Sequence, residues 1–137
     1  MDKVTFIRKA QDAIESRVSI DRHRTERVIG AVFSALSSRL TPGEGKELIA
    51  QLPLELKRLW YEEVAKRQAR GEEEVTKLSK DQFLMKVQNN GRLASITEAE
   101  FVARCVIRTL KEAISPGEIQ DAVAQLPSDL KAWFSAA

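Results

Sequence analysis

The sequence predicts an all-α protein: a tandem duplication of a four-helix unit, with about eight helices in one globule. The first observation is an internal repeat, in which Thr41–Glu44 and Ala50–Pro53 are matched 74 residues later by Ser115–Glu118 and Ala124–Pro127. The second is that apolar residues recur at helical spacing along the chain. The third is that no stretch of useful length alternates apolar and polar residues as a strand would.

The repeat extends beyond its two motifs. At the same offset of 74 residues the aligned pairs are Glu26 and Glu100, Val28 and Val102, Val32 and Val106, Leu36 and Leu110, Leu56 and Leu130, and Lys57 and Lys131. We therefore divide the chain into a first helical repeat (1–70), a polar joint (71–80) and a second helical repeat (81–137). A unit of about half of 137 residues would be marginal alone, so we expect both repeats to share one core.

The first two helices of the first repeat are predicted at Val4–Ser16 and Arg22–Leu40, with Asp21 or Thr25 as the cap of the second. Apolar residues of the second helix cover an arc of about 200°, which is wider than a surface helix requires. Its counterpart in the second repeat is predicted to be capped by the Thr97-x-x-Glu100 pattern. We expect the two repeats to dock through these two central helices.

The rear faces of the two central helices differ. In the first repeat the rear residues are small (Gly30, Ser34, Ser37 and Ser38), whereas the aligned residues are long and charged (Arg104, Arg108, Lys111 and Glu112). We infer that another element covers the first face and that the second faces water. The alternative is that the serine-rich face is itself solvated.

A tight corner follows each central helix. Thr41 is a predicted N-cap, Pro42 suits the first helical position, and Glu44 completes a capping box, an arrangement that Ser115 is expected to repeat. A short helix is predicted at Gly43–Gln51, and Pro53 prevents it from continuing.

The fourth helix of the first repeat is predicted to be longer than its counterpart. It runs from Leu54 to about Arg70, whereas the second version covers only Ser128–Phe134. This extension is our candidate for the element that covers the small-residue face. In the joint that follows, Ser79 and Gln82 form another capping-box pair.

Composition restricts the class of protein. Hydrophobic residues make up 43% and charged residues 31%, which is typical of a soluble globular protein. The net charge is +2, divided as +3 over residues 1–60 and −1 over residues 81–137, which is short of the basic field of a dedicated nucleic-acid binder. One cysteine and an N-terminus without a secretory pattern favour the cytoplasm, and no apolar run is long enough for a membrane span.

The duplicated unit, in which a Pro-Gly-Glu corner and a short helix precede Ala-Gln-Leu-Pro, resembles the bacterial helical proteins called domain of unknown function 2267. The resemblance rests on Ala50–Pro53, Ala124–Pro127 and the glycine-glutamate corners before them. It implies a compact all-helical bacterial protein, and it supplies no catalytic residue or cofactor. One departure is the opening loop of the first repeat, which is about three residues longer, since Phe6 aligns with Phe83.

Side chains capable of chemistry are few. His23 is the only histidine and is expected to be a solvated surface residue. Cys105 aligns with Ala31 in the apolar arc, so we expect a buried core residue rather than a nucleophile. The acidic run Glu72–Glu74 has no histidine or cysteine partner at ligand spacing, so a solvated linker is favoured over a metal site. We expect no enzyme activity, no cofactor and no metal.

Three functions remain as hypotheses. The favoured one is a non-enzymatic interaction or structural module, which binds another protein or itself, with candidate interface residues Gly30, Ser34, Ser37, Trp60, Tyr61, Trp133 and Phe134. These aromatic residues also fit core positions. The alternative is nucleic-acid or anionic-ligand binding through a basic cluster of Arg17, Arg22, Arg24 and Arg27. The third is an apolar ligand pocket between the repeats.

Overall fold

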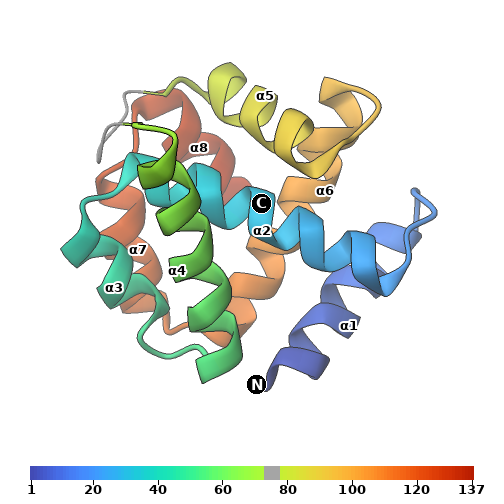
Figure 1. The fold of residues 1–137 in the computed structure, drawn as a ribbon, viewed down its shortest axis with the longest axis horizontal. Coiled ribbons are helices and arrows are strands. Elements are labelled where there is room, and N and C mark those ends of the chain that lie inside the picture. Colours follow the sequence, from blue (N-terminus) through green and yellow to red (C-terminus); the bar gives the residue numbers. More distant parts are fainter. Residues whose placement is uncertain (73–77) are drawn as a thin grey trace.

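The structure is a computed structural model that describes residues 1–72 and 78–137, and it confirms the all-α fold in one globule (Figure 1). The described residues form eight helices: α1 (Lys3–Glu15), α2 (Arg22–Arg39), α3 (Pro42–Ile49), α4 (Leu54–Ala69), α5 (Lys80–Gly91), α6 (Ile96–Ala113), α7 (Pro116–Ala124) and α8 (Ser128–Ala136). Part of the predicted acidic run, Glu73 and Glu74, lies outside the described residues.

One hydrophobic core serves both described parts of the chain, residues 1–72 and 78–137. Fully buried aromatic side chains come from α1, α2, α5 and α8, in the form of Phe6, Phe33, Phe83 and Phe134, and they belong to a single apolar cluster. Because residues from both ends of the sequence contribute to this cluster, neither half has a separate core.

Helix α2 crosses the middle of the molecule (Figure 1). Its most extensive contacts are with α5 and then α4, while α1 packs against α6. The expected contact between α2 and α6 is present, but it is smaller than the contact of α2 with α5 or of α1 with α6, so these other pairs form the larger junctions. The wide apolar arc of α2 explains this, since it lets α5 and α4 cover the helix from different sides.

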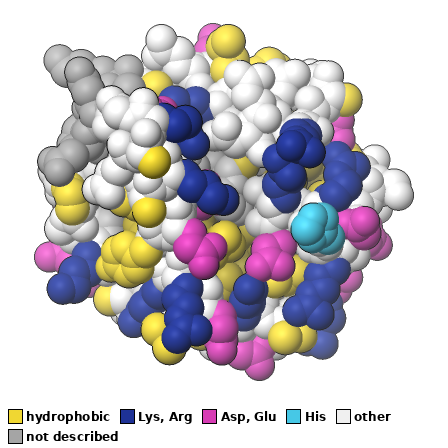
Figure 2. Space-filling view, in the orientation of Figure 1, with side chains coloured by type: hydrophobic (Ala, Val, Ile, Leu, Met, Phe, Trp, Pro, Cys, Tyr) yellow, Lys and Arg dark blue, Asp and Glu magenta, His cyan; other side chains and the backbone are white. Residues whose placement is uncertain are grey.

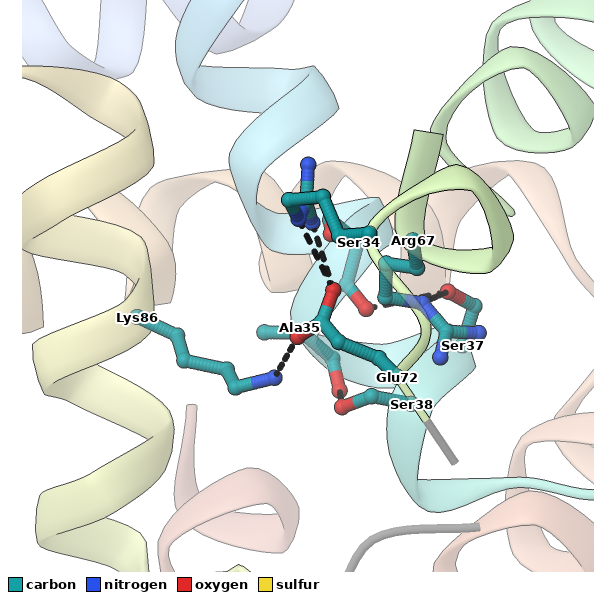
Figure 3. Close-up of polar contacts among 8 residues, drawn as sticks. Ser34, Ala35, Ser37, Ser38, Arg67, Glu72 and Lys86 are labelled. Atoms are coloured by element: carbon teal, nitrogen blue, oxygen red, sulfur yellow. Dashed lines mark hydrogen bonds and ion pairs between the residues drawn. The ribbon is translucent and has the colours of Figure 1, made fainter. Parts of the chain in front are cut away.

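The small-residue face of α2 is covered by α4, as the sequence predicted. A side chain on Gly30 would place its Cβ 2.9 Å from Glu63 Oε1 and 3.7 Å from Leu59 Cδ1, so α4 approaches closely here. Seven residues further along α2, about two turns, the Arg67 guanidinium donates to the Ser37 hydroxyl over 3.2 Å (Figure 3). Residues without bulky side chains on α2 thus allow the long polar side chains of α4 to lie across it.

The rear face of α6 is only partly solvated. Arg108 and Glu112 are exposed, as expected, but Arg104 and Lys111 are half-buried because they extend over α8. The Arg104 guanidinium lies 5.9 Å from the ring centre of Trp133, and Lys111 Nζ donates to the Phe134 carbonyl oxygen over 2.7 Å. These two long side chains hold the short α8 in place.

The two corner motifs differ in their caps. At α3 the predicted capping box is confirmed, with Thr41 and Glu44 each bonding to the other's backbone N–H group. Ser115 does not repeat it, because its hydroxyl makes no cap bond to α7. Instead, Gln51 donates to the Ser115 hydroxyl over 3.0 Å and accepts from the Ser115 backbone N–H over 2.6 Å.

The start of α6 also differs from the sequence prediction. The N-cap is Ser95, whose hydroxyl accepts from the Glu98 backbone N–H over 3.1 Å, and not Thr97. Two overlapping patterns, Ser95-x-x-Glu98 and Thr97-x-x-Glu100, compete at this point in the sequence. Glu100 is occupied elsewhere, because it pairs with Arg104 over 3.0 Å.

Candidate functional site

A polar groove of about 640 Å³ lies where α2, α4 and the end of α5 meet. We call it the α2–α4–α5 groove, and it is lined by His23, Glu26, Arg27, Ala31, Leu59, Glu63, Lys66, Arg70, Asn89, Asn90 and Arg92. On this face of the molecule, lysine and arginine side chains gather around a hollow with acidic side chains between them (Figure 2). The groove joins the two predicted repeats, and it is mostly polar rather than the apolar pocket hypothesised there.

Helix periodicity aims the lining residues of α2 and α4 into the groove. On α2, His23, Arg27 and Ala31 are spaced four residues apart, so they share one stripe of the helix. On α4, Leu59 and Glu63 have the same spacing, and Lys66 and Arg70 continue the stripe. The two apolar members form part of the groove wall, and the charged members surround them.

The third wall comes from the C-terminal end of α5. Arg27 Nε donates to the backbone carbonyl oxygen of Asn90 over 3.3 Å, which fixes α2 against this end of α5. The next residue but one, Arg92, follows the helix with left-handed dihedral angles, φ 53° and ψ 50°. The Asn90-Gly91 break was visible in the sequence, but nothing there indicated that Arg92 would meet residues of α2 and α4.

Two cations of the groove already have carboxylate partners. Lys66 Nζ lies 3.5 Å from Glu63 Oε1, and Arg70 bonds to Glu72 over 2.7 Å. Among the carboxylates, Glu26 pairs with Lys3 over 2.7 Å. The charge on these residues is therefore partly compensated within the chain.

Glu72 links the groove to the body of the protein (Figure 3). Besides Arg70 it accepts from Lys86 of α5 over 3.0 Å, so one carboxylate connects the end of α4 with α5. Burial by itself would raise the pKa of Glu72, but the hydrogen bonds from Lys86 and Arg70 outweigh it and hold the pKa below its ordinary value. Arg70 is thereby held by a carboxylate that stays ionised.

Two cations are less engaged. Within the part of the chain that the structure describes, the exposed Arg92 side chain makes no hydrogen bond or ion pair, and Arg27 bonds only through Nε. The uncompensated positive charge of the groove is thus concentrated beside the end of α5. Two amides, Asn89 and Asn90, line the same region.

The structure divides the predicted basic cluster. Arg27 lines the groove together with His23, whereas Arg22 and Arg24 are exposed on the first turn of α2 outside it. Arg17 lies in a different cleft of about 550 Å³ between α1 and α6, where its guanidinium sits 5.1 Å from the ring centre of Phe101. The four arginines are close in sequence, but only Arg27 lines the groove, and Arg17 lines another cleft.

Most of the candidate interface residues are inside the protein. Gly30 and Ser37 lie beneath α4, Ser34 is buried, and Trp60, Trp133 and Phe134 are core residues. Tyr61 is the exception, with 48% of its surface exposed. Trp60, Trp133 and Phe134 therefore occupy core positions, which was the alternative to an interface role.

The two residues considered for chemistry, His23 and Cys105, differ in their exposure to solvent. His23 is exposed at the groove, as expected of a surface histidine, and Cys105 is buried, as expected of a core residue. Burial raises the pKa of the Cys105 thiol, which disfavours the thiolate that a nucleophile requires. Across residues 1–72 and 78–137, no three His, Cys, Asp or Glu side chains gather as a metal site would need, and no helix could span a membrane.

The fold and groove define a small all-helical protein with a mixed-charge groove between its two halves. The family model DUF2267, described as an uncharacterized conserved protein, matches residues 5–133. The chain therefore belongs to this family, which confirms the family resemblance noted in the sequence. A comparison with curated proteins found no match.

Proposed function

We propose that this protein is a non-enzymatic binding module that takes up a small oxyanion-bearing ligand in the α2–α4–α5 groove. The observation that carries the proposal is the groove itself, a polar hollow of about 640 Å³ with positive charge beside the end of α5. Pockets that hold small molecules fall in the range of roughly 300–1,000 Å³. The cytoplasm is the compartment that we propose with it, in keeping with the single free thiol of Cys105.

Charge pairing supports an anion as the ligand. Lys66 and Arg70 are matched by Glu63 and Glu72, whereas the terminal nitrogens of Arg27 and the whole side chain of Arg92 have no bond among the described residues. Guanidinium groups bind carboxylate and phosphate oxygens in a bidentate geometry, so these two arginines supply the donors that an oxyanion needs.

A small ligand fits the groove better than a nucleic acid. Glu26 and Glu63 lie among the cations, and they would repel a continuous phosphate backbone. Arg22 and Arg24 do not line the groove, so they add no positive charge to its lining. Of the four arginines proposed from the sequence to bind an anion, we therefore keep only Arg27, together with the other residues that line the groove.

Calorimetric titration at low ionic strength tests the proposal. Inorganic phosphate, pyrophosphate and adenosine monophosphate serve as probes, and the wild-type protein is expected to bind at least one of them. Arg27→Gln should weaken this binding about tenfold, the effect of losing one charge-assisted contact of about 1.4 kcal/mol. Arg22→Gln is the matched control on the same helix and should bind as the wild type does.

Two outcomes would contradict the proposal. One is the absence of binding by every probe. The other is salt-sensitive binding of a 20-nucleotide DNA that Arg22→Gln and Arg27→Gln weaken equally, which would favour nucleic acid instead. Urea unfolding of Arg27→Gln shows whether the bond to Asn90 was needed for stability, so that a folding defect is not read as lost binding.

Of the seven candidate interface residues of the protein-interaction hypothesis, only Tyr61 on α4 is exposed at the surface. Light scattering on the same samples tests it. A mass above that of the 15.4 kDa chain would support self-association. A mass that stays at this value would contradict self-association.

A further inference from the structure

Arg92 occupies a backbone position that normally belongs to glycine. It is the only residue other than glycine with a positive φ among residues 1–72 and 78–137, with φ 53°. The end of α4 shows the usual solution, because Gly71 has φ 75° there. L-residues with a Cβ adopt this left-handed conformation reluctantly, whereas glycine adopts it freely.

The conformation is imposed by the way α5 ends. The Arg92 backbone N–H donates to the Asn89 carbonyl over 3.3 Å, and the Leu93 N–H donates to the Gln88 carbonyl over 3.0 Å. This pair of bonds closes a helix with a left-handed residue, and the buried Leu93 completes the cap. All of these interactions involve the backbone or Leu93, so glycine at position 92 would preserve them.

The side chain of Arg92 makes no bond among the described residues that would explain an arginine at this position. It is exposed, and no hydrogen bond or ion pair joins it to any described residue. What it does face is the groove, which it lines with Arg27 and the two asparagines. Strained residues concentrate at binding and active sites, where the side chain repays the conformational cost.

We propose that Arg92 is the residue that determines oxyanion binding in the groove, and that the ligand is a phosphomonoester whose body carries hydroxyl or amino groups. This inference rests on the proposed function. Arg92 and Arg27 hold the phosphate from opposite elements, α5 and α2. The body of the ligand then lies toward Glu63 and Glu26, whose oxygens accept hydrogen bonds from its donors.

The placement of Glu63 is the reason for the second half of the proposal. Its carboxylate lies against Gly30 with 16% of the side chain exposed, and its ion pair with Lys66 is long at 3.5 Å. Inorganic phosphate in the same groove has only its own P–OH groups as donors, on the anion that the arginines hold, and brings no separate donor to this carboxylate. A phosphomonoester with hydroxyl or amino groups satisfies both ends of the groove, so it binds more tightly than phosphate alone.

Three variants of Arg92 separate binding from strain. Arg92→Gln removes the charge and keeps the left-handed strain, so it should weaken adenosine monophosphate binding about tenfold with no change in melting temperature. Arg92→Gly should weaken binding as much and also raise the melting temperature by about 2–4 °C, because the strain is relieved. Arg92→Lys keeps the charge without the planar fork and should retain part of the affinity.

The outcomes distinguish this inference from the proposed function. If the wild type binds no probe, the ligand site itself is refuted. If the wild type binds and Arg92→Gly binds equally well, the groove stands and the role of Arg92 is refuted. If inorganic phosphate binds as tightly as adenosine monophosphate, the part assigned to Glu63 and Glu26 is wrong.

A structural explanation for Arg92 has its own signature. A positive side chain at the C-terminal end of a helix interacts favourably with the helix dipole. In that case Arg92→Gln would lower the melting temperature and leave binding unchanged, and the proposal would be overturned.

Discussion

Gly45 and Trp60 show how single residues adjust the core of this protein. A Cβ on Gly45 would lie 3.2 Å from Trp60 Cζ2, a buried ring atom that cannot move aside easily. In the second half the aligned positions hold Ile119 and Phe134, so a larger residue on the short helix accompanies a smaller ring. The two differences offset each other in volume, which a close-packed interior requires.

Gly45→Ala should therefore destabilise the protein by about 1–2 kcal/mol, because the added methyl group overpacks the contact with Trp60. Gly43→Ala, two residues earlier in α3, is the control. Nothing lies within 4 Å of its Cβ position, so the substitution should be neutral or stabilise by up to about 1 kcal/mol. Urea unfolding of both variants measures the difference, and equal stability would show that Trp60 does not limit the space.

For single residues, the sequence predicted which side chains are buried better than it predicted which residues they contact. It placed Cys105 in the core and offered Trp60 and Trp133 as either core or interface residues, and the structure puts both in the core. It could not show that Trp60 fills the space beside Gly45, since that depends on how α3 and α4 approach each other. Arg92 was missed for the same reason.

At the scale of the helices, the two copies of the repeat differ most clearly in how the N-termini of α3 and α7 are capped. Thr41 caps α3 with its own side chain, whereas Ser115 relies on Gln51 from the other half of the chain. The repeated Ala-Gln-Leu-Pro motif thus performs different tasks in its two copies. The glutamine of the second copy, Gln125, is exposed and has no side-chain hydrogen bond among the described residues.

This asymmetry predicts unequal effects for two equivalent substitutions. Gln51→Ala removes two hydrogen bonds to Ser115 and should cost about 1 kcal/mol, within the usual range for partly exposed bonds. Gln125→Ala removes a side chain without such bonds and should change stability by less than about 0.5 kcal/mol. The comparison uses thermal or urea unfolding. Equal losses would mean that the bonds between Gln51 and Ser115 contribute little.

The element boundaries followed from capping and periodicity, and the helix pairing did not. The capping box of Thr41 and the covering of the small-residue face by α4 were both predicted correctly. The main junction of α2 with α5 was missed, because an arc of apolar residues indicates which face is buried but not which helix buries it. The cap of α6 was predicted at Thr97 and lies at Ser95, because two cap patterns overlap there.

For the molecule as a whole, α4 and α5 are joined through Glu72 at the edge of the groove. Its carboxylate binds Arg70 and Lys86, and these bonds lower its pKa below the ordinary value of 4.5. A carboxyl group with a lowered pKa in the folded state stabilises the protein above pH 4.5. This contribution is lost as the pH falls through the lowered pKa.

Glu72→Gln should therefore reduce stability at pH 7 by about 1 kcal/mol and make the loss of stability below pH 4.5 less steep than in the wild type. Glu62→Gln is the control, since Glu62 lies exposed on α4 without an ion pair among the described residues. Urea unfolding at several pH values tests both variants. A pH dependence unchanged by Glu72→Gln would show that its two ion pairs do not stabilise the fold.

The all-α class and the shared core could be predicted for the whole molecule, because they depend on patterns within each helix. The groove could not be predicted, because Arg27, Lys66 and Arg92 are distant in sequence and meet only when three helices pack. The basic cluster misled for the converse reason, since neighbouring residues such as Arg17 and Arg27 line different clefts.

The most direct test of the central claim is a nuclear magnetic resonance titration of the labelled protein with adenosine monophosphate at low ionic strength. We expect chemical-shift changes to concentrate at Arg27, Lys66 and residues 89–92, with little change at Arg17, Arg104 and Arg108 in the cleft between α1 and α6. Saturable changes confined to the groove are the predicted result. No change, or changes centred on the cleft between α1 and α6, would contradict the assignment of the groove as the ligand site.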